Sequence, residues 1–237
     1  MKIFSLTSIM IFSLLSFQLF AQDNSSLNGA WHSQNSKQES VLLFQDGYFT
    51  QTVYTGKEFL LSYGGPYEVN GKQIDILIEF NSKDKEEVGT QLKSDYSLND
   101  NELSLHLKGG KSVWTRLDSS AAPLVGVWQI TDRVQDGNLV AIQRSGTRKT
   151  LKILTGTRFQ WFAIDPATKL FAGTGGGTYT FIDGKYTESI EFFSRDNTRV
   201  GAKLTFDGKL ENGKWHHRGL SSKGDKIYEV WGRIPSL

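Results

Sequence analysis

The side chains best suited to chemistry in this sequence lie in its second half. Residues 215–218 place a tryptophan, two histidines and an arginine next to one another in one predicted strand. Successive side chains of a strand point to opposite faces, so His216 and His217 cannot both bind one metal ion. One imidazole could instead join the carboxylate of Glu188 or Glu191 in a pocket. A histidine that lies at the surface, or that has its hydrogen bonds already made, is the simpler interpretation.

No recognised catalytic constellation accompanies these residues. The sequence contains no Gly-x-Ser-x-Gly, no His-Glu-x-x-His and no histidines at metal-binding spacing. Glu188 and Glu191 are three residues apart in a predicted strand, so they face opposite sides and do not easily form an acid–base pair. We therefore expect no metal and no cofactor. A barrel-based isomerase or hydrolase using Glu188, Glu191 or His217 stays open, because barrels can host such chemistry on unmatched residues.

Composition and the first residues limit the class of protein. Lys2, the apolar run 3–20 and Ala21 follow the charge, apolar and small-residue order of a secretory signal peptide over residues 1–21, with a membrane anchor as the alternative. We expect a periplasmic or secreted protein with no integral membrane segment after cleavage. The 27 basic and 25 acidic side chains are balanced and form no cluster, which argues against nucleic-acid binding. The absence of cysteine excludes disulfides and thiol catalysis.

The elements that must position these side chains are predicted to be strands. The sequence has 24 glycines, four prolines and few segments with a helical apolar period. Asp46-Gly47, Gly71-Lys72 and Asp183-Gly184 each separate two strand-like segments, which indicates hairpins. Consecutive hairpins form an up-and-down meander, and closure of a long meander into a barrel removes its exposed edges. The predicted class is all-β.

The chain also repeats itself. Leu-x-Gly-x-Trp ending at Trp31 recurs at Trp128, and Val-Trp-x-Arg ending at Arg116 recurs at Arg233. Several intervening segments match in the same order. A tandem duplication explains this pattern. It predicts one copy at 22–116, a linker at 117–123 and a second copy at 124–237.

The paired motifs carry a resemblance to a known family. A Gly-x-Trp in the first strand with an arginine in the last resembles the lipocalin pattern, in which the tryptophan closes one end of an eight-stranded barrel and the arginine packs across it. The resemblance implies two tandem lipocalin-like antiparallel up-and-down β-barrels, closed by Trp31 with Arg116 and by Trp128 with Arg233. The second copy, which ends in Tyr-Glu-Val-Trp-Gly-Arg, is also similar to lipocalin-like secreted bacterial proteins common in the Bacteroidetes.

The fourth strands of the copies suggest which barrel is hollow. Ile74, Ile76, Ile78 and Phe80 share one face in the first copy. Alignment on the Gly-Lys turn matches them to Thr187, Ser189, Glu191 and Phe193, with Glu188, Ile190 and Phe192 on the other face. A shift of one residue would exchange the two faces. We expect a packed first barrel and a more polar second barrel.

These observations favour an exported small-molecule-binding protein whose pocket lies in the second barrel and holds an apolar or amphipathic ligand. Besides the enzyme, an envelope interaction module stays open, in which the apolar face of the first copy contacts the second copy or a partner. A homodimer through that face is a further expectation. The predicted ligand-binding residues are Phe159, Trp161, Tyr179, Phe181, Glu188, Trp215, His217 and Arg218.

Overall fold

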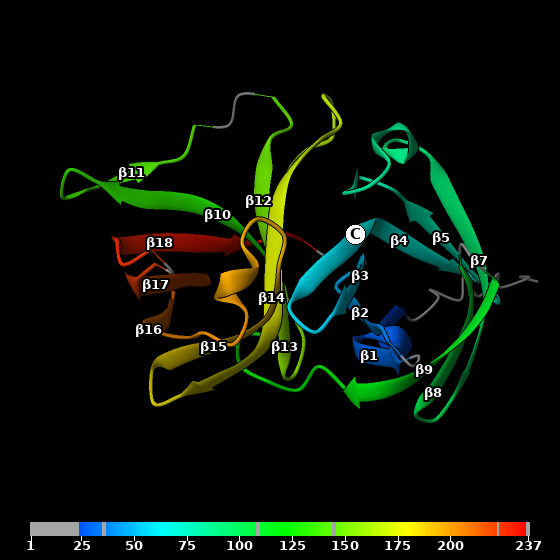
Figure 1. The fold of residues 1–237 in the computed structure, drawn as a ribbon. Coiled ribbons are helices and arrows are strands. Elements are labelled where there is room, and N and C mark those ends of the chain that lie inside the picture. Colours follow the sequence, from blue (N-terminus) through cyan, green and yellow to red (C-terminus); the bar gives the residue numbers. More distant parts are fainter. Residues whose placement is uncertain (1–23, 35–36, 108–109, 144–145, 222, 236–237) are drawn as a thin grey trace, which may run out of the picture.

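The computed structural model describes residues 24–34, 37–107, 110–143, 146–221 and 223–235. The predicted signal peptide lies outside the described residues. Within them the chain forms two closed antiparallel barrels of eight strands each, as predicted. The barrels lie side by side, with the first on the right and the second on the left in Figure 1. None of the helices among the described residues is long and apolar enough to span a membrane.

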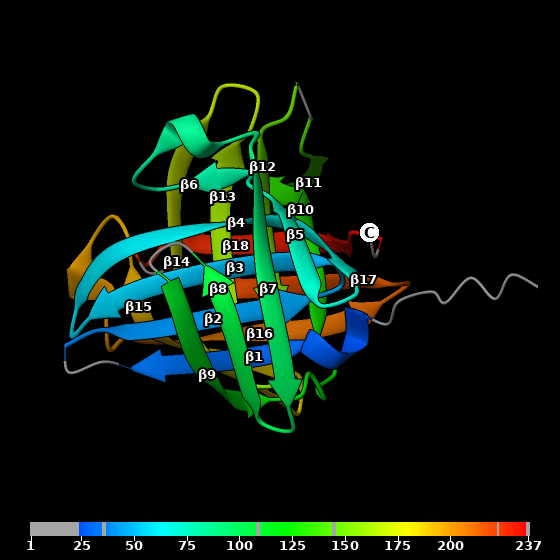
Figure 2. The same cartoon turned by 90° about the vertical axis from the view of Figure 1, so that its right-hand side faces the viewer.

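The first barrel closes because β3 pairs with both β2 and β4, and β1 pairs with β9. A short strand, β6 (Phe80–Asn81), also pairs with β4, and the single-turn helices η1 (Asn24–Leu27) and η2 (Lys85–Glu87) flank the strands. Figure 2 looks at the barrel wall on which β7, β8 and β9 lie. The eight barrel strands are β1 (Gly29–Gln34), β2 (Glu39–Gln45), β3 (Tyr48–Thr55), β4 (Glu58–Asn70), β5 (Gln73–Leu77), β7 (Gln91–Asn99), β8 (Glu102–Leu107) and β9 (Gly110–Asp118).

The second barrel repeats this order and closes through the pairing of β10 with β18. The short strand β11 (Asn138–Ala141) pairs only with β10, and η3 (Asn197–Arg199) follows β15. The barrel strands are β10 (Gly126–Gln135), β12 (Lys149–Leu154), β13 (Arg158–Asp165), β14 (Leu170–Ile182), β15 (Lys185–Phe193), β16 (Lys203–Glu211), β17 (Lys214–Leu220) and β18 (Lys226–Arg233).

The predicted Asp-Gly hairpins form with the left-handed backbone that tight turns need. Asp46 and Gly47 have φ values of 49° and 75°, and Asp183 and Gly184 have 49° and 72°. Positive φ at both central residues matches the twist of the flanking strands, and aspartate with glycine adopts it at low cost. These turns fix the register of the strands that follow.

One end of each barrel is covered by a tryptophan and an arginine. The Arg116 guanidinium lies 3.9 Å from the Trp31 ring centroid, and that of Arg233 lies 4.4 Å from the Trp128 ring centroid. Each indole N–H donates to a backbone carbonyl four residues earlier, at 2.9 Å. A cation over a buried indole is attracted to the ring while it ties the last strand to the first.

The four apolar side chains predicted to share one strand face lie in two different places, because β5 ends at Leu77 and Phe80 belongs to β6. Ile74, Ile76 and Ile78 belong to the interior of the first barrel, each 0–1% exposed. Phe80 instead packs outside it, 4.9 Å in ring separation from Phe162 of the second barrel. The isoleucines are therefore not a surface on which a homodimer could form.

A shared apolar cluster joins the outer faces of β2 and β3 to those of β12 and β13. Tyr48 stacks on Phe162 with ring centroids 5.5 Å apart, and Gln160 donates to Ser62 at 2.9 Å. Asp118 ends β9, two residues into the predicted linker, and accepts hydrogen bonds from the backbone of Gly156 and Thr157 at 2.9 Å. The two barrels therefore share buried contacts as well as a linker.

Candidate ligand-binding site

The strand registers give a position-by-position comparison of the two interiors. Trp31 lies opposite Leu42 on the neighbouring strand, whereas Trp128 lies opposite Lys152. Tyr67 lies opposite Ile76, whereas Tyr179 lies opposite Glu188. The second barrel thus has a lysine and a glutamate at two interior positions where the first has a leucine and an isoleucine.

Lys152 and Glu188 form a buried ion pair. The Lys152 Nζ lies 2.8 Å from Glu188 Oε1, and the two side chains are 5% and 6% exposed. Four aromatic rings surround the ammonium at 5.1–5.7 Å from their centroids, namely Phe159, Tyr186, Trp215 and Trp231. Attraction to ring faces compensates part of the lost hydration of the ammonium.

A second polar pair lies on the adjacent strands β17 and β18. Leu105 lies opposite Ser112 in the first barrel, and the corresponding pair in the second is His217 and Glu229. The His217 Nδ1 lies 3.4 Å from Glu229 Oε2, and Glu229 also accepts from the Trp231 indole at 3.2 Å. His217 is 2% exposed. Neither of its ring nitrogens makes a well-formed hydrogen bond within the described part of the chain.

The protonation states of this pair follow from its surroundings. Burial lowers the pKa of His217, with nearby Lys152 acting in the same direction against Glu229 and Glu188. Burial opposes ionisation of Glu229, but the contacts with His217, Lys152 and Trp231 outweigh it and hold its pKa below the usual value. At neutral pH the histidine is therefore neutral and Glu229 is a carboxylate.

A cavity of about 290 Å³ lies above these groups. Its lining extends from the Lys152–Glu188 pair to Thr150 near the start of β12 and Ser221 just after the end of β17. Below it, Trp215 packs between Trp128 and His217, with ring separations of 5.9 and 5.2 Å. The lining residues are Thr150, Lys152, Trp161, Glu188, Ile190, Phe193, Arg199, Ala202, Leu204, Phe206, His217, Ser221, Ile227, Glu229 and Trp231.

The predicted ligand-binding residues divide between three places. Trp161, Glu188 and His217 line the cavity. Three others belong to the packed core rather than to the cavity lining, namely Phe159, Tyr179 and Trp215. Phe181 is partly buried against this core. Aromatic content alone could not separate a cavity wall from the core beneath it.

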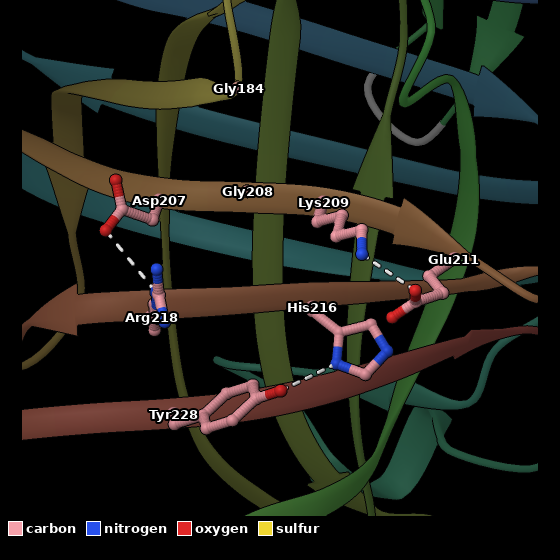
Figure 3. A pocket seen from close by; sticks show the side chains of 8 residues that line it. All are labelled: Gly184, Asp207, Gly208, Lys209, Glu211, His216, Arg218 and Tyr228. Atoms are coloured by element: carbon pink, nitrogen blue, oxygen red, sulfur yellow. Dashed lines mark hydrogen bonds and ion pairs between the residues drawn. The ribbon is translucent and has the colours of Figure 1, made fainter.

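Arg218 does not join the others, because it lies on the outer face of the barrel. It is exposed, and its Nε lies 3.4 Å from Asp207 Oδ2 (Figure 3). His216 lies on the same outer face and contacts the Tyr228 hydroxyl at 2.9 Å. Alternation along β17 separates both from His217, as expected for His216, and Arg218 therefore does not share the cavity with His217.

The predicted alignment of the two fourth strands was displaced by one residue. The buried side chains of β15 are Tyr186, Glu188, Ile190 and Phe192, and the alternate residues are less buried. Glu191 lies outside, where it pairs with Arg158 and accepts from the Tyr54 hydroxyl at 3.0 Å between the barrels. The polar interior of the second barrel is real, but on β15 it comes from Glu188.

Sequence reasoning missed Lys152 and Glu229. Lys152 stands in the segment Leu-Lys-Ile-Leu, which matches Val-Leu-Leu-Phe of the first copy. Glu229 lies two residues before Trp231 and therefore on the same face of its strand. The sequence did contain a signal for such a residue, namely a charged side chain in one copy at a position where the other copy has an apolar one.

Comparison with known proteins reaches the second barrel only. Residues 123–237 match a domain of unknown function, DUF4488. No curated protein matches the chain. This similarity coincides with the barrel that contains the buried polar groups. No three side chains of the metal-ligating types come together among the described residues.

Proposed function

We propose that this protein is an exported binding protein whose second barrel holds a small apolar or amphipathic molecule. The observation that carries the proposal is the replacement of interior apolar residues by Lys152, Glu188 and His217 directly beneath a cavity. Export rests on the signal-like residues 1–21. The first barrel serves as a packed support for the second.

The energetics of burial support a functional origin for the polar groups. An ion pair inside a protein is often less favourable than apolar residues of similar volume, because both charges lose their hydration. Leu42, Ile76 and Leu105 fill the same layer of the first barrel and are 0–1% exposed. This fold therefore accepts apolar residues at these three interior positions. The polar residues of the second barrel cost stability unless a ligand interacts with them.

The unsatisfied imidazole points to the same conclusion. A buried polar atom without a hydrogen bond costs about 1–3 kcal/mol. His217 lines the cavity, so a bound molecule could supply the missing partner. Trp161, Phe193, Phe206 and Trp231 supply apolar contact area around it. A mostly apolar cavity with a few polar groups is typical of small-molecule sites.

Titration with the neutral fluorescent probe N-phenyl-1-naphthylamine tests the proposal. Binding should raise the probe's emission in the wild type and be lost in Ala202→Trp, because Ala202 lines the cavity and the larger ring fills it. Thr205→Trp is the matched control, since Thr205 is exposed on β16, which begins one residue after Ala202. Equal binding by both variants, each folded by circular dichroism, would overturn the proposal.

A further inference from the structure

The charges at the floor of the cavity do not balance. Lys152 contributes one positive charge, Glu188 and Glu229 contribute two negative charges, and His217 is neutral at pH 7. The sum is one excess negative charge next to apolar walls. Charge left unbalanced in a poorly hydrated site is costly, so a cation from outside would be favoured there.

The polar groups at the floor of the cavity also differ in whether they have a hydrogen-bond partner. The Lys152 ammonium already donates to Glu188 at 2.8 Å, and the Trp231 indole donates to Glu229 at 3.2 Å. With the His217 Nδ1 proton directed toward Glu229, the Nε2 atom is a buried acceptor without a donor. The His217 Nε2 atom therefore lacks a donor.

Two cations near the mouth of the cavity are engaged elsewhere, and Arg133, which lies opposite Glu229 on β10, is exposed and does not line the cavity. Arg199 lines the cavity but is paired with Asp196 at 3.0 Å. Lys149, on the strand that carries Lys152, is paired with Glu79 of the first barrel at 2.8 Å. Both positive groups already have carboxylate partners.

Resting on the proposed function, we propose that the ligand carries a protonated amine on an apolar body. The ammonium lies against His217 and Glu229 and donates to both. The body fills the space between Trp161, Phe193 and Trp231. An ammonium is stabilised by carboxylates and by aromatic ring faces together, and it supplies the donor that the His217 Nε2 atom lacks.

A matched series of probes tests the head group apart from the body. Isothermal titration calorimetry at pH 8 compares 4-phenylbutylamine, 4-phenylbutan-1-ol and 4-phenylbutyrate, which share one apolar body. The amine is expected to bind at least about tenfold more tightly than the alcohol, and the acid more weakly than either. Equal affinity for all three, or preference for the acid, would overturn the inference.

A charge-removing variant locates the preference. Glu229→Gln keeps the size of the side chain and should reduce the ratio of amine to alcohol affinity by about tenfold. Glu211→Gln removes the same charge from the outer face, where Glu211 pairs with Lys209, and should leave the ratio unchanged. A preserved ratio in Glu229→Gln would overturn the inference.

The outcomes separate this inference from the proposed function. If N-phenyl-1-naphthylamine binds and Ala202→Trp blocks it, the cavity is a binding site even where the amine shows no preference. In that case only the inferred head group fails. If neither the naphthylamine nor any phenylbutyl probe binds, the proposed function itself fails.

Discussion

The buried pair of Lys152 and Glu188 gives the sharpest test of the interior. Lys152→Leu and Glu188→Ile introduce the residues found at the same positions of the first barrel. Each single change leaves one charge without its partner at 5–6% exposure. Removing one member of a buried pair costs about 3–5 kcal/mol. The double variant removes both charges and should return to within about 1 kcal/mol of the wild type, or exceed it.

The assay is a double-mutant cycle at pH 7. Urea unfolding followed by tryptophan fluorescence and circular dichroism gives the free energy of unfolding of the four proteins. A loss of 3–5 kcal/mol corresponds to a fall in melting temperature of roughly 6–20 °C for a chain of this size. Lys93→Leu is the control, because Lys93 is 57% exposed and lies 3.7 Å from Asp75. It should change stability by less than about 1 kcal/mol.

Additivity would refute this reasoning. If the double variant loses as much free energy of unfolding as the two single variants together, the charges do not stabilise each other. The observed register and burial would then have no energetic consequence. A coupling energy of at least about 2 kcal/mol supports the buried pair.

Three further predictions concern other parts of the fold. Asp118→Asn should cost about 1.5–3 kcal/mol in urea unfolding at pH 7, because the Asp118 carboxylate accepts two backbone N–H bonds from the second barrel. Those bonds help to lower the pKa of Asp118. The difference in free energy of unfolding between the wild type and Asp118→Asn should therefore shrink as pH falls below 3.8. A difference that persists unchanged would contradict this. The lowered pKa of His217 predicts that wild-type stability falls below pH 6.5, by at most about 1.4 kcal/mol per pH unit. His217→Leu should lose that part of the pH profile, and identical profiles would be evidence against a neutral buried imidazole. Arg233→Met should cost about 1–2 kcal/mol by removing the cation over Trp128, and unchanged thermal unfolding would show that the contact is dispensable.

The overall fold was predictable because it depends on local signals that occur twice. The Asp-Gly turns at 46–47 and 183–184 dictate tight hairpins, and the repeated motifs at Trp31 and Trp128 indicate two similar closed units. These signals need only neighbouring residues or a comparison of the copies. Their physical basis is turn geometry and strand alternation, which tertiary contacts rarely override.

The site was only partly predictable because side-chain direction depends on register. A displacement of one residue on β15 exchanged Glu188 with the outward-facing neighbours Ser189 and Glu191. Arg218 was grouped with His217 although adjacent residues of a strand face opposite sides. Lys152 is identified as an interior residue only by the strand register, which places it opposite Trp128. Contacts between the barrels, such as that of Gln160 with Ser62, have no local signal.

Native mass spectrometry tests the central claim most directly, namely that the second barrel holds a small molecule. The wild type and the Lys152→Leu, Glu188→Ile double variant would both be purified from the native host and compared with denatured samples. We predict a reproducible extra mass on the wild type that is lost on denaturation and is absent from the folded double variant. An equal extra mass on both proteins would contradict the assignment of the site to this polar interior. The bare polypeptide mass for the wild type, together with no binding of N-phenyl-1-naphthylamine, would contradict ligand binding altogether.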